Sequence, residues 1–299
     1  MLHDDHLHLR THTAPPPPHE LAPLLKSARE KNIIPGVREH PYLPEMYRIG
    51  PYRDFDYAMH VDEIDRFISL FEAERAPLGL EVDYIAGMEQ EQARIIADMT
   101  RRAEARGVAV NGIIGSVHIL PGRVKDVTYP KGGVKHVMWD LDENVFIAHI
   151  KDRGPERLLR DYFVAMRELV KMKTYDVLGH MDLIRKFDRK NSSGESVFYS
   201  GHEDLYLKLA GGIIELLSET GMGIEINTAG FFKPLGRPYL TQEILDYAVE
   251  LKVPVTLGSD SHTPGGIGAH FDTALHMLET AGAARPSTLV NRGFVEYDA

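Results

Sequence analysis

Short apolar runs alternate with amphipathic helical segments along the whole chain. In segment 61–74, Ile64, Phe67, Ile68 and Phe71 recur at helical spacing, and charged residues occupy the opposite face. This pattern predicts seven helices, over residues 20–31, 61–74, 91–106, 156–171, 203–220, 242–251 and 272–281. The apolar runs predict seven strands, over residues 2–9, 33–39, 80–85, 111–118, 175–178, 223–226 and 253–257.

The alternation of strands and helices predicts a parallel sheet with helices packed outside it. Seven such units in 299 residues favour an α/β fold of the TIM-like type, either a distorted (β/α)7 barrel or a distorted eightfold one. An open, doubly wound sheet is the structural alternative. The sequence shows no linker, internal repeat or low-complexity domain, so we expect a single domain over residues 1–299.

Three segments interrupt this pattern. Segment 14–18 contains four consecutive prolines, segment 42–57 is rich in Tyr, Pro, Arg and Asp, and segment 120–148 contains the only tryptophan, Trp139. Each segment follows a predicted strand, and in a barrel the loops after the strands build the active-site face. The three segments are therefore either parts of an active site or plain surface connections.

Histidines and carboxylates stand where the predicted strands end. His6 and His8 are two residues apart, so in a strand both imidazoles project to the same side and can reach one ion. Asp260 and His262 repeat this spacing after the last apolar run. Imidazole nitrogen and carboxylate oxygen are ligands that borderline and hard divalent metals accept. The pattern indicates a hydrolase with several metals, whose candidate ligands also include His12, His40, Glu81, His118 and His180.

Each of these residues also has a structural interpretation. A lone histidine at a strand end can be a capping or core residue, and Asp260 can cap a turn. Glu81 lies inside an apolar run, where an unpaired carboxylate is costly, so it needs a metal or an arginine partner. Glu89 competes with Glu81 for this role but lies in a polar stretch.

Composition limits the class of protein. The net charge of −10 argues against nonspecific binding to nucleic acids or anionic membranes, although bound cations can still attract a phosphorylated substrate. With no cysteine, disulfides and thiolate zinc sites are excluded. No apolar stretch reaches the ~20 residues of a membrane span, and the N-terminal residues lack an apolar signal core. We therefore expect a cytoplasmic protein and no membrane partner; its oligomeric state is not readable from the sequence.

Seven stretches together resemble the PHP (polymerase and histidinol phosphatase) superfamily and, within it, the histidinol-phosphate phosphatases. In chain order they are DDHLH, EHPYLP, GLEVDYIAG, IGSVHIL, LGHMDLIRKF, EINTAGFFKP and LGSDSHTPGGIG, and they cover nearly the whole length. The resemblance implies a distorted (β/α)7 barrel, the PHP fold, with a trinuclear metal site. Glu81, His118 and Asp260 are the catalytic residues it implies around this site.

The resemblance also implies how the ligands divide among three divalent ions. Nitrogen and oxygen ligands leave the identity of these ions open among Zn, Fe, Mn and Co. His6, His8, Glu81 and Asp260 would hold the first ion, and Glu81 would bridge to a second held by His118 and His180. His12, His40 and His262 would hold the third. Two departures affect this picture: Arg38-Glu39 replaces a frequent Thr-Asp before His40, and His19 competes with His12 as the third N-terminal ligand.

The implied activity is hydrolysis of L-histidinol phosphate to L-histidinol and phosphate in histidine biosynthesis. A hydroxide bridging two metals would attack phosphorus, and the ions would neutralise phosphate oxygens. Arg185 is our candidate phosphate clamp because its planar fork matches phosphate oxygens. Asp182 is a candidate for proton transfer to the leaving alcohol, although the general acid stays open. Lys186 and Arg38 are further candidates for substrate binding, and Lys233 and Arg237 are weaker ones.

Other functions remain compatible with the sequence. The protein could be another kind of PHP phosphoesterase with the same metal site, such as a nucleotide phosphatase or a small exonuclease. A nuclease, however, usually needs a basic groove for the nucleic-acid backbone. A metal-dependent amidohydrolase can also begin with His-x-His, but that class commonly uses a bridging modified lysine where Glu81 stands here. The non-enzymatic alternative is a degenerate barrel that uses metals structurally.

Overall fold

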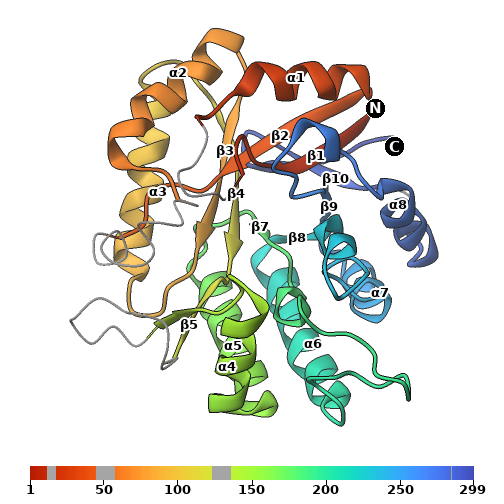
Figure 1. Cartoon of the computed structure of the whole chain (residues 1–299). Coiled ribbons are helices and arrows are strands. Elements are labelled where there is room, and N and C mark those ends of the chain that lie inside the picture. Colours follow the sequence, from red (N-terminus) through yellow and green to blue (C-terminus); the bar gives the residue numbers. More distant parts are fainter. Residues whose placement is uncertain (12–17, 45–57, 123–135, 284) are drawn as a thin grey trace.

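Seven parallel strands form one sheet that curls into a nearly closed barrel (Figure 1). The structure is a computed structural model that describes residues 1–11, 18–44, 58–122, 136–283 and 285–299. The strands follow one another around the sheet in chain order. They are β1 (Leu2–Leu7), β2 (Ile33–Glu39), β3 (Leu78–Asp83), β4 (Val110–Ser116), β7 (Val177–Leu178), β8 (Gly223–Asn227) and β9 (Val255–Gly258).

The first and last strands meet at their carboxyl ends. The His8 amide donates to the Ser261 carbonyl at 2.9 Å, and the Asp260 amide donates to the His6 carbonyl at 2.8 Å. A doubly wound sheet would reverse its strand order at a switch point, and this sheet does not. The predicted sevenfold barrel is confirmed, and the open sheet is the wrong alternative.

Helices cover the outside of the barrel (Figure 1). In α5, an apolar face that includes Leu159, Phe163 and Met166 is buried, while charged residues point outward. This helix begins at Pro155, whose missing N–H is not needed in a first helical turn. The helices are α1 (Leu21–Glu30), α2 (Ile64–Glu74), α3 (Glu89–Glu104), α4 (Glu143–Arg153), α5 (Pro155–Lys171), α6 (Glu203–Thr220), α7 (Gln242–Glu250) and α8 (Phe271–Thr280).

Two regions differ from the sequence prediction. Segment 120–148, expected to be irregular, contains most of the hairpin β5 (Ile119–Pro121) and β6 (His136–Met138) and the start of α4, which Asp142 caps. A C-terminal hairpin, β10 (Ser287–Val290) and β11 (Gly293–Glu296), was not predicted. These strands have three or four residues each, too few for the two-residue alternation to stand out.

The C-terminal hairpin packs against the barrel through Leu289. This side chain is buried with Ile114 and Val177, and its Cδ1 lies 2.4 Å from where a Cβ on Gly112 would sit. Position 112 must therefore stay glycine for the hairpin to approach β4 this closely.

Truncation of Leu289 should destabilise the barrel. Leu289→Ala removes a fully packed side chain that neighbouring groups cannot replace, so we expect the free energy of unfolding to fall by about 2–5 kcal/mol. Denaturant titration measures this change. Val290→Ala is the matched control, because Val290 is 46% exposed and its truncation should change stability by less than about 0.5 kcal/mol. Equal effects of both variants would contradict the packing role of Leu289.

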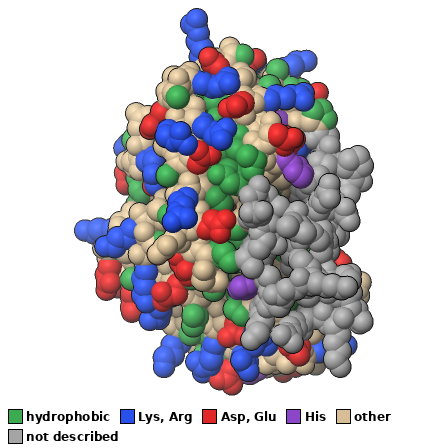
Figure 2. All heavy atoms as spheres, turned by 90° about the vertical axis from the view of Figure 1, so that its left-hand side faces the viewer, with side chains coloured by type: hydrophobic (Ala, Val, Ile, Leu, Met, Phe, Trp, Pro, Cys, Tyr) green, Lys and Arg blue, Asp and Glu red, His purple; other side chains and the backbone are tan. Residues whose placement is uncertain are grey.

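Basic and acidic side chains are interspersed on the face that Figure 2 shows. On this side, Arg106, just after α3, pairs with Glu72 of α2 at 3.2 Å, and Arg102 of α3 pairs with Asp98 at 2.9 Å. This mixture differs from the continuous basic stripe that a nucleic-acid backbone requires. Among the helices of the described part, none combines the length and apolar character needed to cross a membrane.

Candidate metal centre

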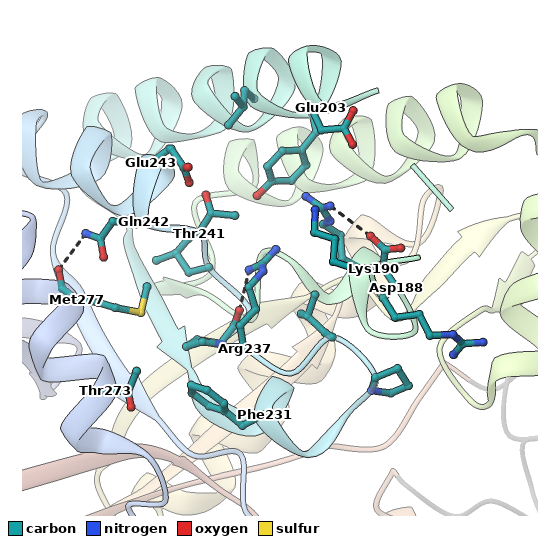
Figure 3. A pocket seen from close by; sticks show the side chains of 18 residues that line it. Asp188, Lys190, Glu203, Phe231, Arg237, Thr241, Gln242, Glu243, Thr273 and Met277 are labelled. Atoms are coloured by element: carbon teal, nitrogen blue, oxygen red, sulfur yellow. Dashed lines mark hydrogen bonds and ion pairs between the residues drawn. The ribbon is translucent and has the colours of Figure 1, made fainter. Parts of the chain in front are cut away.

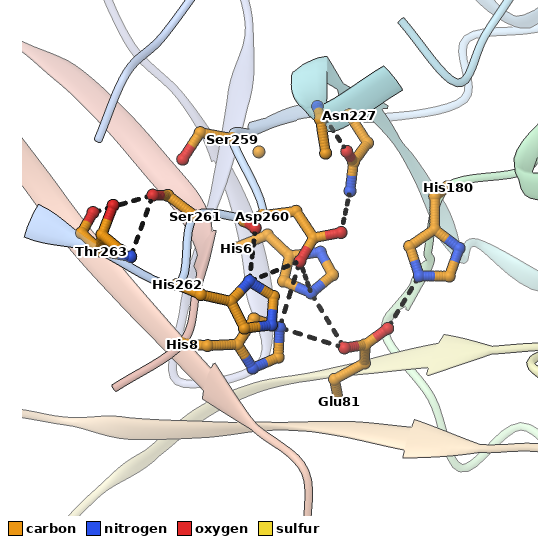
Figure 4. A network of polar contacts seen from close by, with 12 residues as sticks. His6, His8, Glu81, His180, Asn227, Ser259, Asp260, Ser261, His262 and Thr263 are labelled. Atoms are coloured by element: carbon orange, nitrogen blue, oxygen red, sulfur yellow. Dashed lines mark hydrogen bonds and ion pairs between the residues drawn. The ribbon is translucent and has the colours of Figure 1, made fainter. Parts of the chain in front are cut away.

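The candidate metal ligands converge at the carboxyl ends of the barrel strands (Figure 4). His6 belongs to β1 and Glu81 to β3, while His118 and His180 each stand two residues after the end of a strand, β4 and β7 respectively. Because all strands are parallel, their carboxyl ends share one rim, and groups far apart in sequence become neighbours. The structure brings together His6, His8, His40, Glu81, His118, His180, Asp260 and His262.

The Glu81 carboxylate lies at the centre of this cluster. Its Oε2 lies 3.1 Å from His6 Nε2, 3.3 Å from His8 Nε2 and 3.2 Å from His40 Nε2. Its Oε1 lies 2.8 Å from His180 Nε2 and 3.8 Å from His118 Nε2. The two oxygens thus face two separate groups of imidazoles, which is the arrangement of a bridging ligand.

Asp260 extends the cluster on the side of β9. Its Oδ1 lies 3.3 Å from His8 Nε2 and 3.9 Å from His6 Nε2. The His262 ring stacks on the His8 ring with centroids 4.4 Å apart. Asp260 has a φ of 52°, a left-handed conformation that is uncommon for non-glycine residues and frequent at functional sites.

Among the described residues, three overlapping sets of ligand atoms are each compact enough to hold a metal ion. They are His6–His8–Glu81, Glu81–His118–His180 and His8–Asp260–His262, and within each group the ligand atoms lie within 4.8 Å of one another. The first two correspond to the first two predicted sites. His40 lies beside both, because its Nε2 faces Glu81 and its ring stacks on His8 at 4.8 Å.

Carboxylates behind the cluster orient the imidazoles. His6 Nδ1 lies 2.9 Å from Glu225 Oε2, His8 Nδ1 lies 3.2 Å from Glu39 Oε1, and His118 Nδ1 lies 2.6 Å from Asp83 Oδ1. Each contact fixes one ring nitrogen, so the other nitrogen, Nε2, points toward the cluster. Buried carboxylates paired with histidines in this way are common behind metal ligands, where they set the tautomer and raise ligand basicity.

The sequence interpretation missed the roles of Asp83 and Glu225. A signal existed, because Asp83 stands two residues after Glu81 in β3 and therefore projects to the same face. Asn227 repeats this spacing after Glu225 and donates to Glu225 Oε1 at 2.9 Å and to Asp260 Oδ2 at 3.3 Å. These two contacts place Asn227 beside the cluster, where it positions Glu225 and Asp260.

The charges of the cluster fit divalent cations. Burial alone raises the pKa of the Glu81 carboxyl, but the facing imidazoles of His40 and His6 outweigh burial and hold that pKa well below its usual value. Burial also opposes ionisation of Asp260, and His6 and His8 likewise keep its pKa well below the ordinary value. Two ionised carboxylates surrounded by imidazoles, most of them buried, are nitrogen and oxygen donors that suit Zn, Mn, Fe or Co.

Loss of the carboxylate behind His118 should weaken metal binding. Asp83→Asn keeps the shape of the side chain but removes the charge that holds the imidazole, so we expect roughly 10–100-fold lower metal affinity. Competition with a chelator of known affinity measures it. Asp246→Asn is the control, because Asp246 is exposed on α7, where it accepts a bond from Gln242. Unchanged affinity in Asp83→Asn would exclude a positioning role for this residue.

The third N-terminal ligand stays a prediction. His12 lies outside the described residues. His19, its competitor, is buried at the edge of the cluster with Nε2 3.8 Å from Glu39 Oε2, and its ring packs edge-on against Phe67.

A cavity of about 280 Å³ opens beside the cluster. Glu81, His118, His180 and Asp260 line it, so a ligand there would contact bound metals. Its walls also include Lys186, Lys233, Asp140 and Tyr239, and we call this cavity the metal pocket. Lys186 Nζ lies 3.0 Å from Asp140 Oδ2 and 2.8 Å from the Asp140 carbonyl. Of the cations that the sequence offered for substrate binding, Lys186 and Lys233 therefore line the metal pocket.

The structure does not bring Arg185 into the metal pocket. Arg185 lines a second cavity of about 690 Å³ between the starts of α6 and α7 (Figure 3). There it pairs with Asp188 at 3.2 Å and lies over the Tyr206 ring. Arg237 lines the same cavity and pairs with Asp182 at 2.8 Å. In this position, Arg185 does not reach a phosphate in the metal pocket, and Asp182 is engaged by Arg237. The geometry therefore does not support Arg185 as a phosphate clamp or Asp182 as a proton donor.

Arg38 lies deeper in the barrel than the cluster. Its side chain crosses Gly79, the residue paired with it on β3, where an added Cβ would lie 2.4 Å from Arg38 Cδ. Its Nη2 lies 3.6 Å from Asp5 Oδ1. Because residues two apart on a strand share a face, Arg38 occupies the layer below His40. In that layer, the Arg38 guanidinium neutralises the charge of the buried Asp5, and it does not line the metal pocket.

Sequence comparison relates the chain to two curated proteins over most of its length. It is 27% identical to the histidinol-phosphatase of Bacillus subtilis over 294 residues, which cover 91% of this chain and 97% of that protein. It is 25% identical to the "Probable histidinol-phosphatase" of Deinococcus radiodurans over 252 residues, 82% of this chain and 80% of that protein. The chain is a homologue of histidinol-phosphatases. No family model matches the sequence.

Structural comparison identifies the fold. The histidinol phosphate phosphatase of Lactococcus lactis, solved in complex with zinc, L-histidinol and phosphate, superimposes with a TM-score of 0.61. The match covers 98% of both chains at 19% sequence identity. This homologue of histidinol-phosphatases therefore has the PHP barrel fold, as its motifs predicted.

Proposed function

We propose that the protein is a metal-dependent phosphomonoesterase that hydrolyses L-histidinol phosphate to L-histidinol and phosphate. The observation that carries this proposal is the Glu81 carboxylate, whose two oxygens face two groups of histidines beside a cavity. The names of the two sequence relatives support the substrate, as do the zinc, L-histidinol and phosphate bound by the Lactococcus protein.

The donor set supports three divalent ions. His6, His8, Glu81 and Asp260 would hold the first, and Glu81, His118 and His180 the second. His40 and His262, completed by His12 or His19, would hold the third. When bound, such ions lower the pKa of water and neutralise phosphate oxygens, which are the main requirements of phosphomonoester hydrolysis.

Other side chains of the protein orient the metal ligands and bind the phosphoryl group. Glu39, Asp83 and Glu225 fix the imidazoles, so the ligand atoms are positioned before substrate arrives. Lys186 and Lys233 line the metal pocket and supply positive charge for the phosphoryl oxygens. We therefore assign phosphate binding to these two lysines in place of Arg185. The contacts of Lys186 with Asp140 hold its ammonium group in the pocket.

The experiment that tests the function is a comparison of substrates. Phosphate release from L-histidinol phosphate is measured beside a generic phosphomonoester and a nucleotide monophosphate. We expect kcat/KM for histidinol phosphate to exceed the other two by roughly 100-fold or more, because a site that pairs with a substrate's polar groups rejects analogues that lack them. A preference for the nucleotide would instead favour another PHP phosphoesterase, and no turnover of any ester would remove the phosphatase proposal.

A further inference from the structure

Tyr239 lies in the wall of the metal pocket, between β8 and α7. Its amide donates to the Asn227 carbonyl at 2.9 Å, and its own carbonyl accepts from the Asp182 amide at 3.1 Å. The backbone is thus tied to the ends of two barrel strands. Its ring packs edge-on against the His180 ring with centroids 6.2 Å apart. The side chain therefore has a fixed place next to one of the candidate metal ligands.

The Tyr239 hydroxyl is buried and has no hydrogen-bond partner among the described residues. Two other buried tyrosines are satisfied: Tyr199 donates to the Ile184 carbonyl at 2.9 Å, and Tyr206 donates to Asp182. A buried hydroxyl without a partner destabilises the folded protein, since it gave up its bonds to water. Such a group in the wall of a cavity points to a ligand that supplies the missing partner.

The chemistry of the pocket indicates which ligand atom that is. A phenol is protonated at neutral pH and can donate one hydrogen bond. Lys186 and Lys233 line the same cavity, so the ligand placed there is expected to carry anionic oxygens. Tyr239 lines the metal pocket and its ring stands beside the His180 ring, so a ligand bound in the pocket would lie next to this side chain.

We propose that the Tyr239 hydroxyl donates a hydrogen bond to a non-bridging oxygen of the phosphoryl group in the metal pocket. This inference rests on the proposed function for the nature of the ligand. It makes Tyr239 a residue that binds the phosphoryl group, alongside the two lysines. It also explains why an unsatisfied hydroxyl is kept in the wall, since phenylalanine would fill the same space.

Tyr239→Phe tests the contact in the metal-loaded protein. Binding of inorganic phosphate is measured by calorimetry, thermal unfolding is measured without phosphate, and KM and kcat are measured with histidinol phosphate. We expect phosphate affinity to fall about tenfold, the value of one hydrogen bond to a charged group, with a parallel loss in kcat/KM. Without phosphate, the melting temperature should be unchanged or higher, because the variant removes an unsatisfied hydroxyl.

Tyr162→Phe is the matched control. Tyr162 is fully buried, packs edge-on against Trp139 and does not line the metal pocket. This variant should bind phosphate as the wild type does, so a loss common to both variants would overturn the inference. Unchanged phosphate affinity in Tyr239→Phe would also overturn it, even if kcat fell, because the hydroxyl would then act on the leaving group or only on packing.

The two proposals fail in distinguishable ways. A wild-type protein that hydrolyses histidinol phosphate while Tyr239→Phe behaves identically would overturn the hydroxyl contact alone. A wild-type protein that hydrolyses no phosphomonoester but binds phosphate, with weaker binding in Tyr239→Phe, would overturn the proposed function and keep the contact. A metal-loaded wild type that neither hydrolyses any phosphomonoester nor binds phosphate would overturn both.

Discussion

Glu81→Gln should lower kcat by about 1000-fold or more while the barrel stays folded. The amide keeps the size of the side chain, but it cannot offer two anionic oxygens to the two groups of imidazoles on either side. Loss of the bridging charge weakens metal binding and removes preorganised electrostatic stabilisation, and the loss of a single such group typically costs 100–1000-fold in rate. The measurement is kcat at saturating substrate and metal, with the metal content of the same sample determined in parallel.

Glu89→Gln is the matched control for this experiment. Glu89, the competing acidic residue in the sequence, accepts bonds from the Tyr84 hydroxyl at 2.8 Å and from the Gly87 amide at 3.0 Å, at the start of α3. Its substitution should leave kcat within about twofold, since it lies outside the metal pocket. Circular dichroism checks that both variants keep native helix content. Near-normal turnover of Glu81→Gln would remove Glu81 from the bridging position.

Removal of metal by a chelator should abolish turnover, and the metal-free protein should unfold at a lower temperature. Ions at 1000 times their dissociation constant stabilise the folded protein by about 4 kcal/mol for each site. For a chain of this size, about 4 kcal/mol corresponds to a shift of roughly 8 °C in melting temperature. Phosphate release and thermal unfolding of one chelated sample measure both effects.

Restoration of Zn, Mn, Fe and Co in turn identifies the ions that support turnover. The control is the same treatment with a chelator saturated beforehand with zinc, which should leave activity and melting temperature unchanged. More than about a tenth of the original turnover in protein shown to be metal-free would contradict a metal-dependent mechanism. Lost turnover without any change in melting temperature would indicate that few of the clustered residues bind metal.

The cluster was largely predictable because it depends on two simple regularities. Residues two apart on a strand share a face, so their spacing alone places His6 beside His8. Parallel strands place their carboxyl ends on one rim, which brings Glu81, His180 and Asp260 together from distant parts of the chain. Both regularities act through the backbone, so they hold without knowledge of side-chain packing.

The substrate-binding cations were harder to predict, and the reason is geometric. Arg185 and Lys186 are adjacent, but Arg185 ends a 3-10 turn, η4 (Leu183–Arg185), in which consecutive side chains point about 120° apart. Arg185 therefore enters the second cavity while Lys186 enters the metal pocket. Arg38 shares a strand face with His40 but lies one layer deeper in the barrel. There it pairs with the buried Asp5 and does not reach the metal pocket.

The sequence by itself determined the alternating strands and helices, the barrel they form and most residues of the metal cluster, because apolar periodicity and strand ends are local features. The tertiary structure alone decided which side chains face the metal pocket, which carboxylates orient the imidazoles, and that Leu289 packs against Gly112. These properties depend on the approach of residues distant in sequence. Packing between such residues decides that Arg185 enters one cavity and Lys186 the other. The spacing of residues along the chain does not predict this.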